Sequence, residues 1–148
     1  MGAIENLRAL GLELPPAPTE RGKLAPAVRT GNLVYTSGST SQITGKLGAE
    51  VTVEQGYEAA RQAIVGCLGS VAHLVGDLDQ VTRVVKLLGM VNAGDGFTDT
   101  PGVIHGATDL LLEVFGAEVG WHARSAIGVY QLPGNAAVEI ELIVEVRD

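Results

Sequence analysis

Two runs of alternating apolar residues near the end of the chain most strongly limit what it can fold into. Within residues 123–129 and 138–146, apolar side chains recur at alternate positions: Ala123, Ile127 and Val129, then Val138, Ile140, Leu142, Val144 and Val146. Because side chains of a β-strand point alternately to its two faces, each run predicts a strand with one buried face. Pro133-Gly134 between the runs favours a turn, so we expect the two strands to pair as a hairpin.

The register of this hairpin predicts which charged side chains lie together. If both apolar sets are buried on one side, Ile127 faces Ile140, and the opposite face carries Arg124, Gly128, Glu139 and Glu141. Arg124 and Glu139 would then lie roughly 13 Å apart along the strands, at about 3.3 Å per residue. That separation is too long for an ion pair but suits a small molecule held at both ends. The alternative is an ordinary solvated charged face.

The preceding sequence predicts two long helices and a central strand. Residues 52–75 begin with a Thr/Gln capping box and then carry apolar residues every three or four positions, which is typical of an amphipathic helix. Residues 84–92 are apolar on both faces, as in a strand at the middle of a sheet. A second helix is expected from Asp99 or Thr100 to Gly116, with proline in its first turn. Two helices cover one face of a sheet, so the open face predicts a homo-oligomer.

Composition favours one domain spanning residues 1–148, with an N-terminal helix and proline-containing arm at 1–23 and a core at 24–148. No apolar run approaches the roughly 20 residues needed to cross a bilayer, so no membrane association is expected. The net charge of −7, without a cluster of Lys or Arg, argues against binding to nucleic acid. The single cysteine, Cys67, fits a reducing cytoplasmic location, and its helical surroundings predict a buried thiol.

Few residue patterns in the chain suggest a catalytic site. The three histidines lack the spacing of metal ligands, so no metal is expected, and no cofactor either. No GxSxG motif is present, and the serines have no evident base partner. Arg124 and Glu139 remain, because arginine binds carboxylates through a planar fork and a glutamate can deprotonate a water.

Several short motifs, in this order along the chain, resemble the Rid family of reactive intermediate deaminases, also known as endoribonuclease L-PSP or YjgF-like proteins. The matching segments are Gly31-Asn32-Leu33-Val34-Tyr35-Thr36-Ser37-Gly38, Val84-Val85-Lys86, Ala123-Arg124-Ser125, Leu132-Pro133 and Val138-Glu139-Ile140-Glu141. The N-terminal arm and an apparent insertion at 94–104 look more like a divergent branch of the family, of about this chain's length.

This resemblance implies an α+β, chorismate-mutase-like fold and a homotrimer with ligand sites at the clefts between subunits. It implies that Arg124 binds the carboxylate of a 2-imino (enamine) acid. Glu139 would position the water that attacks the imine carbon, releasing ammonia and a 2-keto acid. Ser37 and Gly38 match positions that line the same pocket, and Ala126 stands where family members often carry cysteine.

Two departures from the family pattern leave alternative functions open. Leu24 stands where the deaminating members have a pocket tyrosine, and Ala126 replaces the frequent cysteine. The leading hypothesis is a trimer that binds small carboxylates at Arg124 and hydrolyses 2-imino acids through Glu139. The first alternative is a non-catalytic metabolite-binding or scaffold trimer, which would need Arg124 but not Glu139. A ribonuclease or translation inhibitor, the family's older label, fits poorly with the acidic chain.

Overall fold

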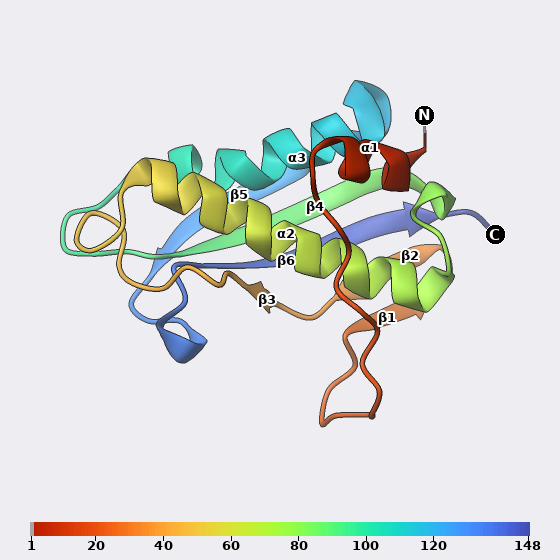
Figure 1. Cartoon of the computed structure of the whole chain (residues 1–148), viewed down its shortest axis with the longest axis horizontal. Coiled ribbons are helices and arrows are strands. Elements are labelled where there is room, and N and C mark those ends of the chain that lie inside the picture. Colours follow the sequence, from red (N-terminus) through yellow and green to blue (C-terminus); the bar gives the residue numbers. More distant parts are fainter. Residues whose placement is uncertain (1) are drawn as a thin grey trace.

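The computed structural model describes residues 2–148 as one mixed sheet with helices on one side (Figure 1). The helices are α1 (Ala3–Ala9), α2 (Val53–Val75) and α3 (Thr100–Gly120), and the strands are β1 (Ala27–Thr30), β2 (Leu33–Thr36), β3 (Ser39–Thr40), β4 (Val81–Asn92), β5 (Ala123–Val129) and β6 (Val138–Val146). Two 3₁₀ turns, η1 (Leu78–Gln80) and η2 (Pro133–Asn135), precede β4 and β6. The expected helices and strands are thus confirmed, with β4 beginning at Val81 rather than at residue 84. No helix in this part of the chain is both long and apolar enough to span a membrane.

The ends of the two long helices follow from local side-chain chemistry. The Thr52 hydroxyl accepts a hydrogen bond from the Gln55 amide, while the Gln55 side chain accepts one from the Thr52 amide, which is the predicted capping box. Asp99 caps α3 through the Gly102 amide, at 3.0 Å. Gly116 adopts φ 81° and breaks the helical conformation, as expected, but the chain turns helical again and continues to Gly120.

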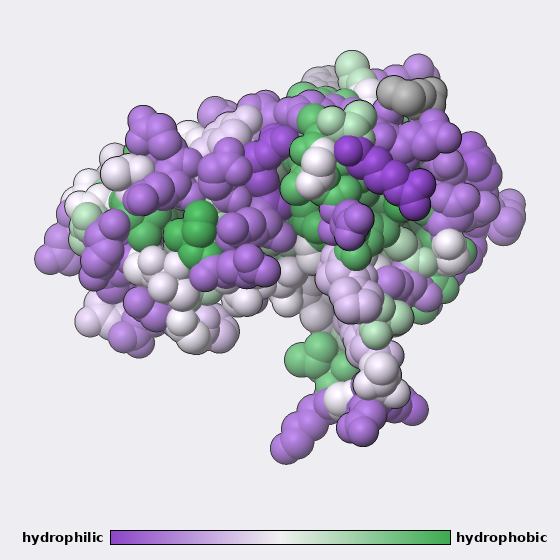
Figure 2. Space-filling model, in the orientation of Figure 1, coloured by the Kyte–Doolittle hydropathy of each residue, from purple (hydrophilic) through white to green (hydrophobic). Residues whose placement is uncertain are grey.

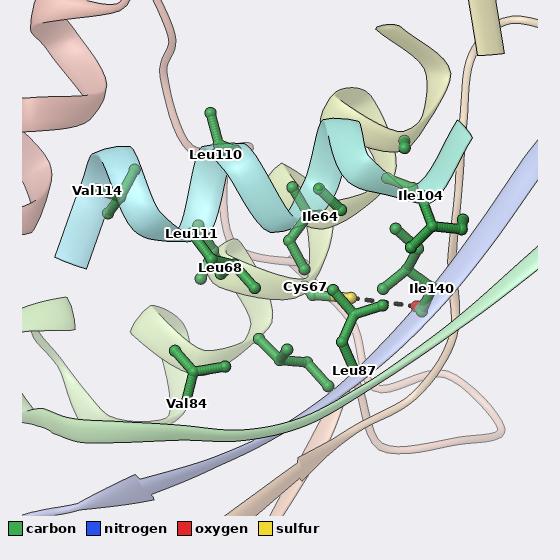
Figure 3. Close-up of a cluster of buried hydrophobic side chains, with 14 of the residues drawn as sticks. Ile64, Cys67, Leu68, Val84, Leu87, Ile104, Leu110, Leu111, Val114 and Ile140 are labelled. Carbon is green, nitrogen blue, oxygen red and sulfur yellow. Dashed lines mark hydrogen bonds between the residues drawn. The ribbon is translucent and has the colours of Figure 1, made fainter. Parts of the chain in front are cut away.

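The core lies between α2, α3 and the face of the sheet that the helices cover (Figure 3). Side chains of α2 and α3 pack above strands β4 and β6. Large side chains from all four elements are fully buried: Ile64, Leu68, Ile104, Leu110 and Leu111 of the helices, and Leu87 and Ile140 of the strands. Cys67 belongs to this core, as predicted. Its thiol donates a hydrogen bond to the Ile140 carbonyl oxygen at 3.2 Å, and burial raises the pKa of Cys67 to about 12. A thiol so far from ionising is a packing residue and not a nucleophile.

The N-terminal segment follows the predicted order of a short helix and an extended arm. Helix α1 and the beginning of the arm pack on the core through Ile4, Leu7, Leu12 and Leu14. Figure 2 shows apolar side chains at the surface beside this junction, while the following loop, residues 16–26, protrudes from the body and is exposed throughout. The arm therefore covers the helices only along its first part.

The predicted pairing of the last two strands is wrong. The strand order is β1-β2-β6-β4-β5, with β3 also pairing with β6, so β4 lies between β5 and β6. Strand β5 runs parallel to β4 and forms the edge of the sheet, whereas β6 runs antiparallel to β4 and occupies the middle. The segment with Pro133-Gly134 is a longer connection containing η2 and not a hairpin loop. Strand β4 therefore has a partner along each of its two edges.

The insertion of β4 also overturns the predicted sharing of a face by Arg124 and Glu139. Arg124 pairs with Leu87, which pairs with the buried Leu142, so this row points towards the helices. Glu139 pairs with Met90, three residues further along β4, and that row points to the open side. Since directly paired side chains share a face and successive residues alternate, the two charges lie on opposite faces. Gly128 joins the helix side and Glu141 the open side.

The open face of the sheet carries apolar side chains that the helices do not cover. Ile127, predicted to be buried within the protomer, lies there and is 45% exposed, and Tyr35 of β2 and Val28 of β1 are 42% and 55% exposed. The alternating apolar residues of β5 predicted a face buried under the helices. They instead form part of an apolar surface on the side of the sheet that the helices leave open.

Candidate functional site

Arg124 lies at the edge of the sheet, where strand β5 passes under helix α3. Its Nη1 donates hydrogen bonds to Nδ1 of His105 at 2.8 Å and to Oγ1 of Thr108 at 3.2 Å. The two partners are three residues apart on α3, so they occupy one face of that helix. Helix α3 connects the parallel strands β4 and β5, and this connection places the His105 and Thr108 face of the helix over β5.

A second histidine continues the hydrogen-bond chain behind Arg124. His122 Nε2 lies 3.2 Å from Thr108 Oγ1, and His122 Nδ1 lies 2.6 Å from the Gly120 carbonyl oxygen. Burial lowers the pKa of His122 below its ordinary value, and the charge of Arg124 acts in the same direction, while the hydrogen bond to Gly120 opposes them. His122 is therefore a neutral partner that supports Thr108.

The lowered pKa of His122 predicts a pH-dependent stability. Between its folded and unfolded pKa, the unfolded state binds more protons, so the free energy of unfolding should fall as the pH drops below about 6.5, the ordinary histidine value. Denaturant unfolding of the wild type and of His122→Gln, measured from pH 8 to pH 5 at one protomer concentration, checks this. The wild type should lose more stability over this range; equal losses in the two proteins would contradict the assignment.

Glu139 belongs to a separate group of predicted site residues near β3. It pairs with Thr40 of β3 on one side and with Met90 on the other, and its carboxylate lies against Gly38. A side chain at position 38 would collide with this carboxylate, which gives Gly38 a steric role. Ser37 is half-buried beside it, with its hydroxyl donating to the Ala25 carbonyl oxygen at 2.6 Å.

The predicted site residues thus form two groups within the protomer. Ser37, Gly38 and Glu139 lie together, whereas Arg124 shares the helix side with Ala126, whose carbonyl oxygen accepts a hydrogen bond from Thr100 at 2.9 Å. A cavity of about 820 Å³ between the arm, α2 and β3 contains none of these five residues. Among residues 2–148, no three His, Cys, Asp or Glu side chains converge in an arrangement that could hold a metal ion.

Sequence reasoning missed His105 and Thr108 as partners of Arg124. Their spacing of three residues within the predicted helix was visible, but the hairpin prediction removed α3 from the neighbourhood of Arg124. A prediction that β5 runs parallel to β4 would have pointed to His105 and Thr108, because a helix that connects two parallel strands packs on the face of both strands.

The chain is similar to known proteins in sequence and in structure. Residues 5–146 match the family described as "YjgF/chorismate_mutase-like, putative endoribonuclease". The chain is 42% identical to protein TCP17 of Trypanosoma cruzi, over 97% of this chain and 93% of the relative. It is 30% identical to a 2-iminobutanoate/2-iminopropanoate deaminase of Dermatophagoides farinae, over 92% and 95% of the two chains. The solved structure of Atu1372 from Agrobacterium tumefaciens, a protein described as having unknown function, is 37% identical with a TM-score of 0.88, covering 97% of this chain and 91% of that one.

Proposed function

Because the chain belongs to the YjgF/chorismate mutase-like family, we propose that it binds small carboxylates between the protomers of a homotrimer and hydrolyses 2-imino acids there. The observation that carries this proposal is the division of the matched residues into two half-sites, one around Arg124 and one around Glu139. A similar protein that is named a 2-iminobutanoate/2-iminopropanoate deaminase supports the substrate class.

Arg124 supplies the substrate-binding half. A guanidinium is charged at every accessible pH and presents parallel N–H groups that match the two oxygens of a carboxylate. Its contacts with His105 and Thr108 hold the group in place before a ligand arrives, so less side-chain entropy is lost on binding. Carboxylate recognition by Arg124 is common to both the catalytic and the non-catalytic alternatives.

Glu139 supplies the hydrolytic half. Its carboxylate accepts a proton from a water molecule while the water oxygen attacks the imine carbon, forming a C–O bond. Glu139 returns its proton to the nitrogen, the proton of the added hydroxyl follows as the C=O bond forms, and the C–N bond breaks, so the products are ammonia and a 2-keto acid. One water is consumed for each imine, so the atoms balance without a cofactor.

The two half-sites support a cyclic assembly. Arg124 and Glu139 lie on opposite faces of one sheet, so one protomer does not bring both to one ligand. A head-to-tail ring closes this gap, because each interface joins the Arg124 side of one protomer to the Glu139 side of the next. The uncovered apolar side chains of the open face, among them Tyr35 and Ile127, are available for burial in such a ring.

Ammonia release tests the proposal directly. An amino acid oxidase generates 2-iminobutanoate or 2-iminopropanoate in place, and the rate of ammonia formation is compared with the spontaneous rate. The wild type should exceed that rate, Arg124→Ala and Glu139→Ala should not, and Arg21→Ala, a change in the exposed arm, should match the wild type. A wild-type rate equal to the spontaneous rate contradicts the deaminase.

Pyruvate binding by the same variants identifies the non-catalytic alternative. Leu24, which stands where deaminating members have a tyrosine, is 66% exposed and offers no hydroxyl to a ligand. If the wild type released no ammonia but still bound pyruvate, and only Arg124→Ala lost that binding, the protein would be a carboxylate-binding module instead of an enzyme.

A further inference from the structure

Both N–H groups on Nη1 of Arg124 already have partners within the protomer. A guanidinium has five N–H groups, two on each Nη and one on Nε. Nη1 donates to His105 and to Thr108, whereas no described residue accepts from Nη2 or Nε. The Nη2 and Nε groups point in parallel from one edge of the plane, and that edge matches a carboxylate.

The hydrogen-bond chain behind Arg124 has only one consistent direction. Arginine only donates, so Nδ1 of His105 must accept, and the proton of a neutral His105 is on Nε2. The Gly120 carbonyl oxygen can only accept, so Nδ1 of a neutral His122 is the donor and its Nε2 must accept the hydroxyl proton of Thr108, whose oxygen also accepts from Arg124. His122 then carries its proton on Nδ1, where it donates to the Gly120 carbonyl oxygen. From Nη1 of Arg124 to the Gly120 carbonyl oxygen, each contact thus joins one donor to one acceptor, which makes the chain a support for Arg124.

From this arrangement we infer that His105 and Thr108 are positioning residues that make Arg124 bind its ligand through the Nε/Nη2 edge. The inference rests on the proposed function, because it assigns the ligand carboxylate to Arg124. With Nη1 occupied, the end-on edge formed by Nη1 and Nη2 is closed to a bidentate ligand. His105 is exposed and lies outside the packed core.

Binding of pyruvate, a product of 2-iminopropanoate hydrolysis, measures the contribution of the two supports. His105→Ala removes the acceptor and should weaken binding about tenfold, as expected for the loss of one hydrogen bond to a charged group. His105→Asn places an oxygen near the position of Nδ1 and should stay close to the wild type. Likewise, Thr108→Val should weaken binding, and Thr108→Ser should not. In turnover, KM should rise for His105→Ala while kcat stays nearly constant.

A double-mutant comparison shows whether His105 acts through Arg124. In an Arg124→Ala background, His105→Ala should have no further effect on pyruvate binding. An equal loss in both backgrounds would show that His105 contacts the ligand by itself, and would overturn the positioning role.

Nuclear magnetic resonance separates failure of this inference from failure of the proposed function. The ring ¹⁵N shifts of His105 should report an unprotonated Nδ1, and the Nη protons of Arg124 should exchange with water faster in His105→Ala than in the wild type. A protonated Nδ1, or unchanged exchange, overturns the positioning role whether or not pyruvate binds. If these signals are as expected and pyruvate does not bind, the support of Arg124 stands and the assignment of its ligand falls.

Discussion

Mixing Arg124→Ala protomers with Glu139→Ala protomers should restore about a quarter of the wild-type rate of imine hydrolysis, although each variant alone is inactive. Each site in a ring takes Arg124 from one protomer and Glu139 from its neighbour. When the two variants assemble at random in equal amounts, the required pair meets at about one interface in four. If one protomer supplied both residues, no mixed site would be intact.

Co-expression with two different affinity tags gives the mixed assemblies, and purification through both tags removes the trimers that contain one variant only. Each remaining head-to-tail trimer has one intact site of three, so the purified sample should show about a third of the wild-type rate. The control joins Arg124→Ala with an Arg124→Ala/Glu139→Ala double variant, which contains no intact Arg124 and should remain inactive. A purified mixture that stays at the spontaneous rate would contradict the composite site. Such a result would leave the carboxylate-binding part of the proposal to be judged by pyruvate titration.

Replacing Gly106 by alanine should lower the free energy of unfolding by about 2 kcal/mol. Helices α2 and α3 approach so closely here that a Cβ on Gly106 would overlap the backbone carbonyl of Tyr57. A backbone atom cannot rotate away, so the helices must separate, at a cost of up to about 3 kcal/mol. Alanine regains about 1 kcal/mol through its higher helix propensity, which is too little to offset this cost.

The separation would also strain two side-chain contacts across the same helix pair. Tyr57 donates a hydrogen bond to Asp109 at 2.6 Å, and Arg61 pairs with Glu113 at 3.3 Å. Denaturant unfolding at matched protomer concentration measures the loss, because concentration affects the stability of an assembly. Gly22→Ala is the matched control, since nothing lies within 4 Å of the added Cβ. Equal stability of the two variants would contradict the close approach.

The sequence was sufficient to predict the helices because their signals are local. The capping box at Thr52, the Asp99 cap and the break at Gly116 each involve residues within a few positions of one another. Amphipathic spacing then identified the faces that became buried. The resemblance to a known family added the fold class, which the family match and the solved structures confirm.

Strand pairing could not be predicted in the same way, because alternation does not specify the partner. The apolar positions of β5 and β6 suit a hairpin and equally suit pairing with opposite edges of β4. The decision depends on contacts far apart in sequence, such as the hydrogen bonds from the Asn92 amide to the Ala137 carbonyl oxygen at 2.9 Å and from the Ala137 amide to the Ile43 carbonyl oxygen at 3.0 Å. These hold the β5-β6 connection across the end of β4.

The same error changed the geometry of the candidate site but not its residues. Arg124 and Glu139 were chosen from their chemistry and from matched motifs, neither of which depends on strand order. Their placement on one face depended on the hairpin alone. The observed strand order identifies His105 and Thr108 as partners of Arg124. It also divides the site residues between the two sides of the sheet.

The position of β6 has a consequence for how the protein is made. This strand is the last in chain order, yet it pairs with β2, β3 and β4 in the middle of the sheet. A ribosome delivers the chain from its N-terminus, so β2 can pair with β1 and β4 with β5 first, but each keeps one edge unpaired until β6 emerges. Sheet formation therefore waits for the end of the domain's translation, and nascent chains stalled before Val138 should depend on chaperones to avoid edge-to-edge association.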